Sequence, residues 1–108
     1  MKKTCESVGA RREIRDLYET VVDYLVRSQF FDIEIALKSI ENNTALNTSI
    51  KGYEVIETNS MECKIASKNK QTVFVFGVVG ITHISYDLPS RVFIIEYDSG
   101  TRLSFRIN

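Results

Sequence analysis

Three residues of the types that form a Ser-His-Asp catalytic triad stand at alternate positions of one segment, namely His83, Ser85 and Asp87. The segment alternates like a β-strand, so all three side chains would face the same way. Alternate strand residues lie about 6.5 to 7 Å apart, which separates His83 from Asp87 by about 13 Å. A triad needs hydrogen bonds of about 2.6 to 3.2 Å between its members. His83 is the single histidine of the chain, so we expect a structural histidine, no catalytic residues and no enzymatic activity.

Carboxylates and thiols are the other groups that could do chemistry. The acidic candidates gather in three places: Asp32 and Glu34; Glu54, Glu57 and Glu62; Glu96 and Asp98. None of these groups has the spacing of a calcium-binding loop, and such charges usually stay solvated. Cys5, Cys63 and His83 supply too few ligands for a four-ligand Cys/His zinc site. The sequence therefore predicts neither a metal nor a cofactor, and it has no Gly-Lys-Ser/Thr loop for a phosphate.

The composition describes an ordinary globular chain. Its 108 residues are 44 % hydrophobic and 26 % charged, which predicts one domain spanning residues 1–108. The 14 basic residues balance the 14 acidic ones, so no cationic excess indicates a nucleic-acid or membrane-surface protein. Charged residues interrupt residues 4–16, where a signal peptide would be apolar, and no apolar run could span a membrane. With two cysteines expected as free thiols, we predict a cytoplasmic protein.

The first part of the chain is expected to be helical. Residues 10–27 carry an apolar stripe at three- and four-residue steps, formed by Ile14, Leu17, Tyr18, Val21, Val22 and Leu25. Residues 29–41 fit a helix and a strand, and we favour a helix because several of them are good helix formers. This makes residues 10–41 a helical part, preceded by an N-terminal tail at 1–9 and followed by a polar loop at 42–49.

The second part of the chain, residues 50–107, is β-branched and aromatic and predicts an antiparallel sheet of five strands. We place these strands at residues 50–57, 61–66, 72–86, 91–98 and 101–107. Gly77 and Gly80 predict a bulge or bend within the third strand, and Asp98-Ser99-Gly100 predicts a tight hairpin turn. The fold class that we expect is α+β, with two N-terminal helices packed on a curved five-stranded antiparallel meander or small open barrel.

Protein binding is the function that we favour, because the sequence gives little support for an enzyme or a nucleic-acid-binding protein. Phe30 and Phe31 are adjacent large aromatics that cannot easily share one core, so one of them is a candidate for partner contact. Arg102 and Arg106 lie on the last strand, which we interpret as a sheet edge open to a partner strand. We expect a small non-enzymatic module of the inhibitor, antitoxin, immunity or adaptor type that binds another protein and pairs with itself as a homodimer.

Nucleic-acid binding is the alternative. Its candidate residues are the basic side chains around one turn and on the last hairpin: Lys64, Lys68, Lys70, Arg91, Arg102 and Arg106. Sheet aromatics could stack on bases beside them. Acidic residues such as Glu62 and Glu96 would interrupt a continuous positive track, which makes this the weaker prediction.

Overall fold

A computed structural model describes the backbone of residues 2–6, 11–39 and 41–108, and the side chains of residues 13–39 and 41–108. One helix lies within these residues, α1 (Arg11–Arg27). Nine strands accompany it: β1 (Lys2–Glu6), β2 (Ile33–Ser39), β3 (Thr44–Ile50), β4 (Glu54–Thr58), β5 (Glu62–Ala66), β6 (Val73–Gly77), β7 (Ile81–Asp87), β8 (Val92–Tyr97) and β9 (Thr101–Ile107).

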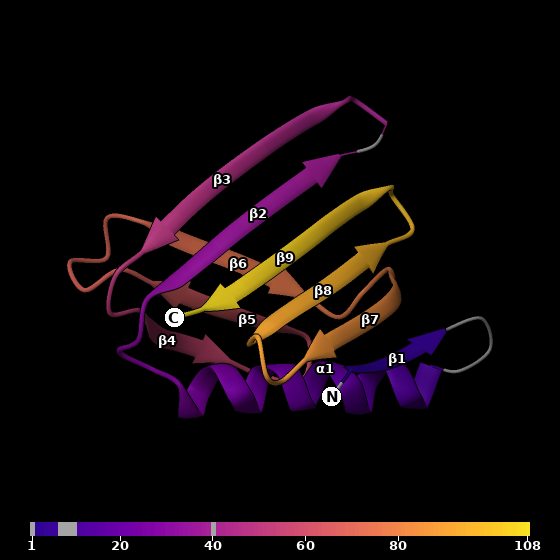
Figure 1. Cartoon of the computed structure of the whole chain (residues 1–108), viewed down its shortest axis with the longest axis horizontal. Helices are drawn as coiled ribbons and strands as arrows, with labels where there is room; N and C mark the ends of the chain where they lie inside the picture. Colours follow the sequence, from indigo (N-terminus) through magenta and orange to yellow (C-terminus); the bar gives the residue numbers. More distant parts are fainter. Residues whose placement is uncertain (1, 7–10, 40) are drawn as a thin grey trace.

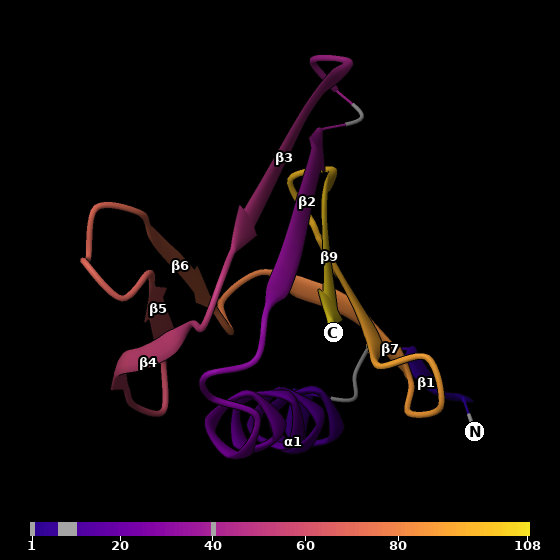
Figure 2. The ribbon, with the colours of Figure 1, turned by 60° about the vertical axis from the view of Figure 1, so that its left-hand side comes forward.

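The strands form two antiparallel sheets. The large sheet has the order β1-β7-β8-β9-β2-β3, and the small sheet has the order β4-β5-β6. Seen in Figure 1, α1 runs along one end of both sheets, and the turned view in Figure 2 shows the sheets on either side of the space above the helix. Figure 2 also shows the β2–β3 hairpin extending beyond the rest of the molecule.

The helix predicted at residues 10–27 is confirmed as α1. Its apolar stripe faces the core, because Ile14, Leu17, Tyr18, Val21 and Leu25 are all buried. The hairpin predicted at 91–98 and 101–107 is also confirmed as β8 and β9, with Gly100 in the turn at φ +85°.

The prediction of two helices is wrong, because residues 29–41 contain β2. Ile33 and Ile35 are buried, whereas Glu34 between them is exposed, as on a strand with one face in water. β2 pairs along its whole length with β9 on one side and β3 on the other. These long-range hydrogen bonds outweigh the local helix propensity of residues 36–38. The polar loop predicted at 42–49 is wrong for the same reason, since most of it is β3.

The five-stranded sheet is also wrong, because the strands are more numerous and divide between two sheets. The long strand predicted at 72–86 is two strands, β6 and β7, in different sheets. Gly80 turns the chain between them at φ +86°, a conformation that side chains disfavour. The first strand predicted at 50–57 begins too early, since β4 starts at Glu54. The tail predicted at 1–9 contains β1, which pairs with β7, while residues 7–9 lie outside the described residues.

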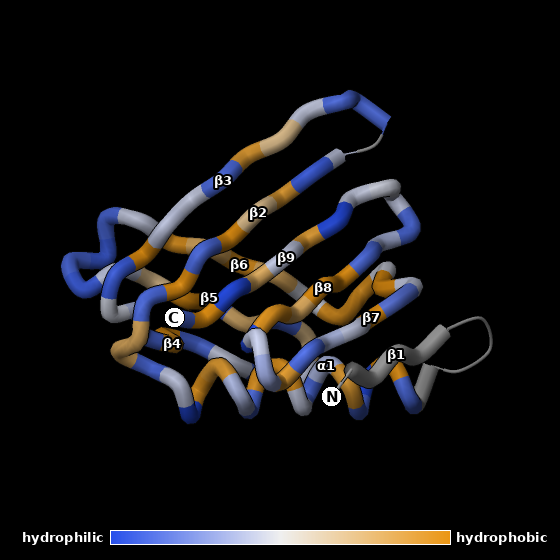
Figure 3. The backbone as a smooth tube through the Cα atoms, in the orientation of Figure 1, coloured by the Kyte–Doolittle hydropathy of each residue, from blue (hydrophilic) through white to orange (hydrophobic). Residues whose placement is uncertain are grey.

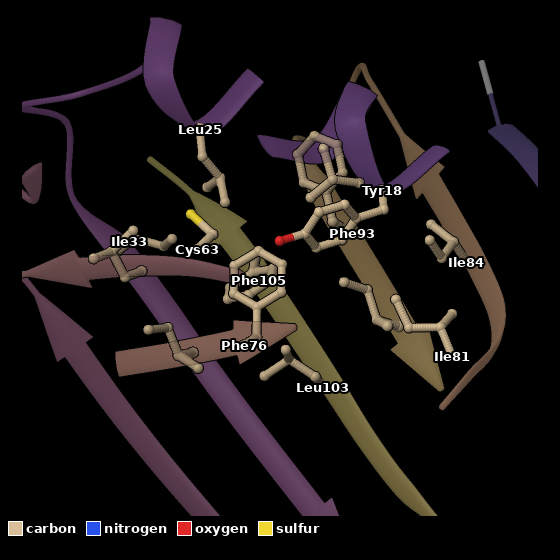
Figure 4. Close-up of a cluster of buried hydrophobic side chains, with 14 of the residues drawn as sticks. Tyr18, Leu25, Ile33, Cys63, Phe76, Ile81, Ile84, Phe93, Leu103 and Phe105 are labelled. Atoms are coloured by element: carbon tan, nitrogen blue, oxygen red, sulfur yellow. The ribbon is translucent and has the colours of Figure 1, made fainter. Parts of the chain in front are cut away.

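The hydrophobic core fills the space enclosed by α1 and the two sheets. Figure 4 shows side chains from all three layers meeting there, and Figure 3 shows that strands of both sheets contain apolar stretches. The Phe105 ring of β9 contacts the Phe76 ring of β6 at a tilt and the Phe74 ring edge-on, with ring centroids 5.0 and 6.0 Å apart. Tyr18 of α1 meets the Phe76 ring edge-on at 5.8 Å. These contacts join the sheets to each other and to the helix.

Candidate interaction surface

Two exposed phenylalanines form the turn between α1 and β2. The side chain of Phe30 is 64 % exposed and that of Phe31 is 48 % exposed. We call Phe30, Phe31 and the neighbouring Arg91 the Phe corner. Exposing a large aromatic side chain to water is unfavourable, so two adjacent exposed phenylalanines indicate a surface available for contact with another molecule.

The backbone of the corner is fixed by Tyr53. Phe30 N–H donates to the Tyr53 carbonyl over 2.8 Å, and Tyr53 N–H donates to the Phe31 carbonyl over 3.1 Å. Phe30 has φ +76°, a left-handed conformation that costs a residue with a Cβ about 1–2 kcal/mol. The two hydrogen bonds offset this cost and hold the Phe30 side chain outward.

Arg91 completes the corner from the turn between β7 and β8. Its guanidinium carbon lies 5.7 Å from the centre of the Phe31 ring, a cation–π contact. The Arg91 carbonyl accepts a hydrogen bond from Ile107 N–H over 3.1 Å, which anchors the turn to the end of β9. The structure therefore places this candidate for nucleic-acid binding beside the aromatic residues.

The edge predicted at the last strand is wrong, because β9 lies between β8 and β2 in the large sheet. Arg102 and Arg106 remain exposed on the outer face of that sheet, the face away from the core. In the register, Arg102 stands opposite Glu96 and Arg106 stands opposite Glu34. Their main chains are used by neighbouring strands, so neither arginine can guide a partner strand onto β9.

The basic candidates do not lie on one strand or one sheet. Lys64 belongs to β5 of the small sheet, where its Nζ lies 3.3 Å from Glu57 Oε1. Lys68 and Lys70 lie in the turn from β5 to β6, whereas Arg102 and Arg106 lie on the large sheet. Arg102 and Arg106 stand opposite the carboxylate residues Glu96 and Glu34 in the strand register given above.

His83, Ser85 and Asp87 lie on one strand, β7, after the shift in register between Ile81 and His83. His83 stands opposite Glu96 in the register, and Ser85 is buried. Asp87 accepts a hydrogen bond from Ser90 Oγ over 2.8 Å. Within the described residues, no group of three or more His, Cys, Asp or Glu side chains is arranged to hold a metal ion. No helix among the same residues has the length and hydropathy needed to cross a membrane.

Burial controls the titration of the side chains beneath these surfaces. Desolvation raises the pKa of the Cys63 thiol to about 11, partly opposed by a hydrogen bond with Thr58. Desolvation also raises the pKa of Tyr97 to about 12, although its hydrogen bond to the Gly77 carbonyl lowers it somewhat. Both groups are neutral at pH 7, as buried core groups should be.

One exposed edge was missed by the sequence reasoning. The run Val73-Phe74-Val75-Phe76 is apolar on both faces, a pattern typical of a central strand covered on both sides. β6 is instead the last strand of the small sheet, with Val73 48 % and Val75 43 % exposed. The run itself carried no information about its neighbours, because strand order depends on the whole fold.

Comparison with known proteins supports the fold and nothing more. No protein-family model matches the chain, and no curated protein matches it. A solved structure described as the crystal structure of ChuX is similar, with a TM-score of 0.56 and 11 % sequence identity. The match covers 97 % of this chain and 61 % of that one, so this chain corresponds to only part of ChuX.

Proposed function

We propose that this protein is a non-enzymatic module that binds another protein through the Phe corner. The observation that carries the proposal is that Phe30 and Phe31 are both exposed while their backbone is fixed by hydrogen bonds to Tyr53. Burying one phenylalanine side chain contributes roughly 1.5–3 kcal/mol. Because the backbone is already ordered, little of that gain would be lost to ordering the chain on binding.

The chemistry of the corner indicates the kind of partner that fits it. Aromatic residues and arginine are the types that contribute most to protein interfaces. Arg91 lies over the Phe31 ring and is exposed, so its guanidinium can bind a carboxylate of a partner. Exposed Lys51 lies two residues before Tyr53. The complementary surface is therefore an apolar pocket with a carboxylate placed to meet Arg91, since the corner also presents the exposed carboxylate of Asp32 beside Phe31. A cytoplasmic location, which we also propose, agrees with the free thiol of buried Cys63.

The test compares two variants by capture of partners from a lysate and identification by mass spectrometry. Phe30→Gly removes the aromatic side chain at a residue whose φ suits glycine, so the fold should be retained. Leu46→Ser is the matched control, because Leu46 is 61 % exposed but belongs to the β2–β3 hairpin. We expect a protein that binds the wild type and Leu46→Ser but not Phe30→Gly.

A set of captured proteins that Phe30→Gly leaves unchanged would contradict the proposal. The homodimer, which we also propose, has its own test. If the Phe corner joins two copies of this chain, the mass by light scattering rises with concentration in the wild type and falls to the monomer in Phe30→Gly.

A further inference from the structure

The main chain of β6 has unpaired hydrogen-bonding groups along one side. Val78 N–H donates to the Met61 carbonyl, and Ser67 N–H donates to the Thr72 carbonyl, both over 2.9 Å, at the two ends of the β5–β6 ladder. Antiparallel ladders alternate, so Phe74 and Phe76 direct their main-chain groups toward β5. The groups of Val73, Val75 and Gly77 therefore point away from β5, where no described strand pairs with β6. The Gly77 carbonyl accepts a hydrogen bond from the Tyr97 hydroxyl, so the main-chain groups of Val73 and Val75 are the ones open to a partner strand.

The sequence does nothing to block this edge. Natural edge strands are usually protected by charges, prolines or bulges. β4, at the opposite edge of the small sheet, has Glu54, Glu57 and a bulge between Val55 and Glu57. β6 has none of these features, and the chain carries no charged residue from 71 to 82.

A groove of about 290 Å³ runs beside the free edge of β6. Phe74 and Phe76 form one wall, and Leu37 and Leu103 on the inner face of the large sheet form the other. Tyr97 closes one end, where its hydroxyl donates to the Gly77 carbonyl over 2.7 Å. A strand laid against β6 would thus have main-chain partners at its edge and an apolar groove for alternate side chains.

We propose that this groove binds an extended peptide segment of a partner protein, which adds as an antiparallel strand to β6. Residues of the segment that stand opposite Phe74 and Phe76 point into the groove, so they are aliphatic. The residues between them lie beside Val73 and Val75 on the outer face, where they cover part of each exposed valine.

The charges at the two ends of the groove set the direction of the segment. Exposed Lys68 and Lys70 lie in the turn before β6, whereas exposed Asp98 and Glu41 lie by the β8–β9 turn near the Gly77 end. An antiparallel segment begins at the Gly77 end and finishes at the lysines. Its chemistry is therefore basic at the N-terminal end, alternating aliphatic in the middle and acidic at the C-terminal end.

The test uses two blocked, fluorescently labelled peptides of identical composition, Lys-Thr-Leu-Thr-Leu-Thr-Glu and its reverse, Glu-Thr-Leu-Thr-Leu-Thr-Lys. Fluorescence anisotropy should show tighter binding of the first peptide. Val75→Lys, which places a charge on the edge strand, should weaken binding at least about tenfold. Ile56→Lys is the matched control, since Ile56 is 40 % exposed on the other edge of the same sheet and should leave binding unchanged. Lys68→Glu/Lys70→Glu should remove the preference for the first peptide.

The outcomes separate this proposal from the one for the Phe corner. Phe30→Gly should leave peptide binding unchanged, because Phe30 lies outside the groove. The Lys68→Glu/Lys70→Glu variant changes only exposed residues of the turn before β6, so it should keep the fold. Its preference between the two peptides can therefore be measured even if Val75→Lys fails to fold. Failure of both peptides to bind at millimolar concentration, or equal affinity for the two in the wild type, would overturn the proposal.

Discussion

The Tyr53 hydroxyl donates a buried hydrogen bond of 2.7 Å to the carbonyl oxygen of Leu25. Leu25 lies in the last turn of α1, where carbonyl groups have no partner within the helix. Tyr53 also exchanges main-chain hydrogen bonds with Phe30 and Phe31. A single residue before β4 therefore anchors the end of the helix and the backbone of the Phe corner, which links the stability of the core to the geometry of the proposed binding surface.

Replacing Tyr53 by phenylalanine should destabilise the protein. The change removes the donor and leaves a buried carbonyl without a partner, which costs about 1–3 kcal/mol. We expect the urea midpoint to fall with little change in the slope of the transition. An unchanged midpoint would show that the helix end does not depend on this hydrogen bond.

Replacing Tyr18 by phenylalanine should have the opposite sign. The Tyr18 hydroxyl is buried and has no hydrogen-bond partner among the described residues. Burying such a group costs free energy, so its removal should raise the free energy of unfolding by roughly 1 kcal/mol. The same urea titration compares the two tyrosine variants, and a lower midpoint for Tyr18→Phe would contradict the prediction.

The parts of the fold that the sequence predicts correctly are those set by local patterns. The apolar stripe of α1 repeats over several turns, and Gly100 suits the tight turn between β8 and β9. Residues 29–41 are different, because their pattern fits both a helix and a strand and their helix propensity favours the wrong one. The choice there is made by pairing with distant strands, as in the pair Ile33 and Ile107, and no local property of the segment contains that information.

The candidate surfaces also differ in whether local sequence or strand order determines them. Adjacent Phe30 and Phe31 are recognisable from sequence, since two neighbouring aromatics rarely face one core. The position of Arg102 within the sheet depends on strand order, and so does the free edge of β6 at Val75. A hydrophobic run is typical of a covered strand, and only the assembled sheets show that one side of this run is open.

Replacing Gly77 by alanine should destabilise the small sheet. A Cβ at residue 77 would lie 2.9 Å from the Met61 carbonyl oxygen, which is a backbone atom and cannot rotate away. That same oxygen accepts the hydrogen bond from Val78 N–H, so β5 and β6 would have to separate locally. We expect a loss of about 1–3 kcal/mol, as for other overpacked sites. Thermal unfolding measures it, and amide exchange should quicken in β6 before it does in β9; a variant as stable as the wild type would contradict the contact.

Stability should fall with rising pH above about 9, because of Cys63. Burial raises the pKa of its thiol from 9.0 to about 11 in the folded protein. Below pH 9 the thiol is protonated in both the folded and the unfolded protein, so the difference in pKa does not change the free energy of unfolding. Between pH 9 and 11 the unfolded chain releases this proton while the folded protein keeps it, so the free energy of unfolding decreases as the pH rises. Urea titrations from pH 7 to 10 measure the slope, and Cys63→Ala is the control, since it should lower stability at every pH but flatten the decline between pH 9 and 10. An equal decline in the wild type and the variant would show that other groups, such as the tyrosines, cause it.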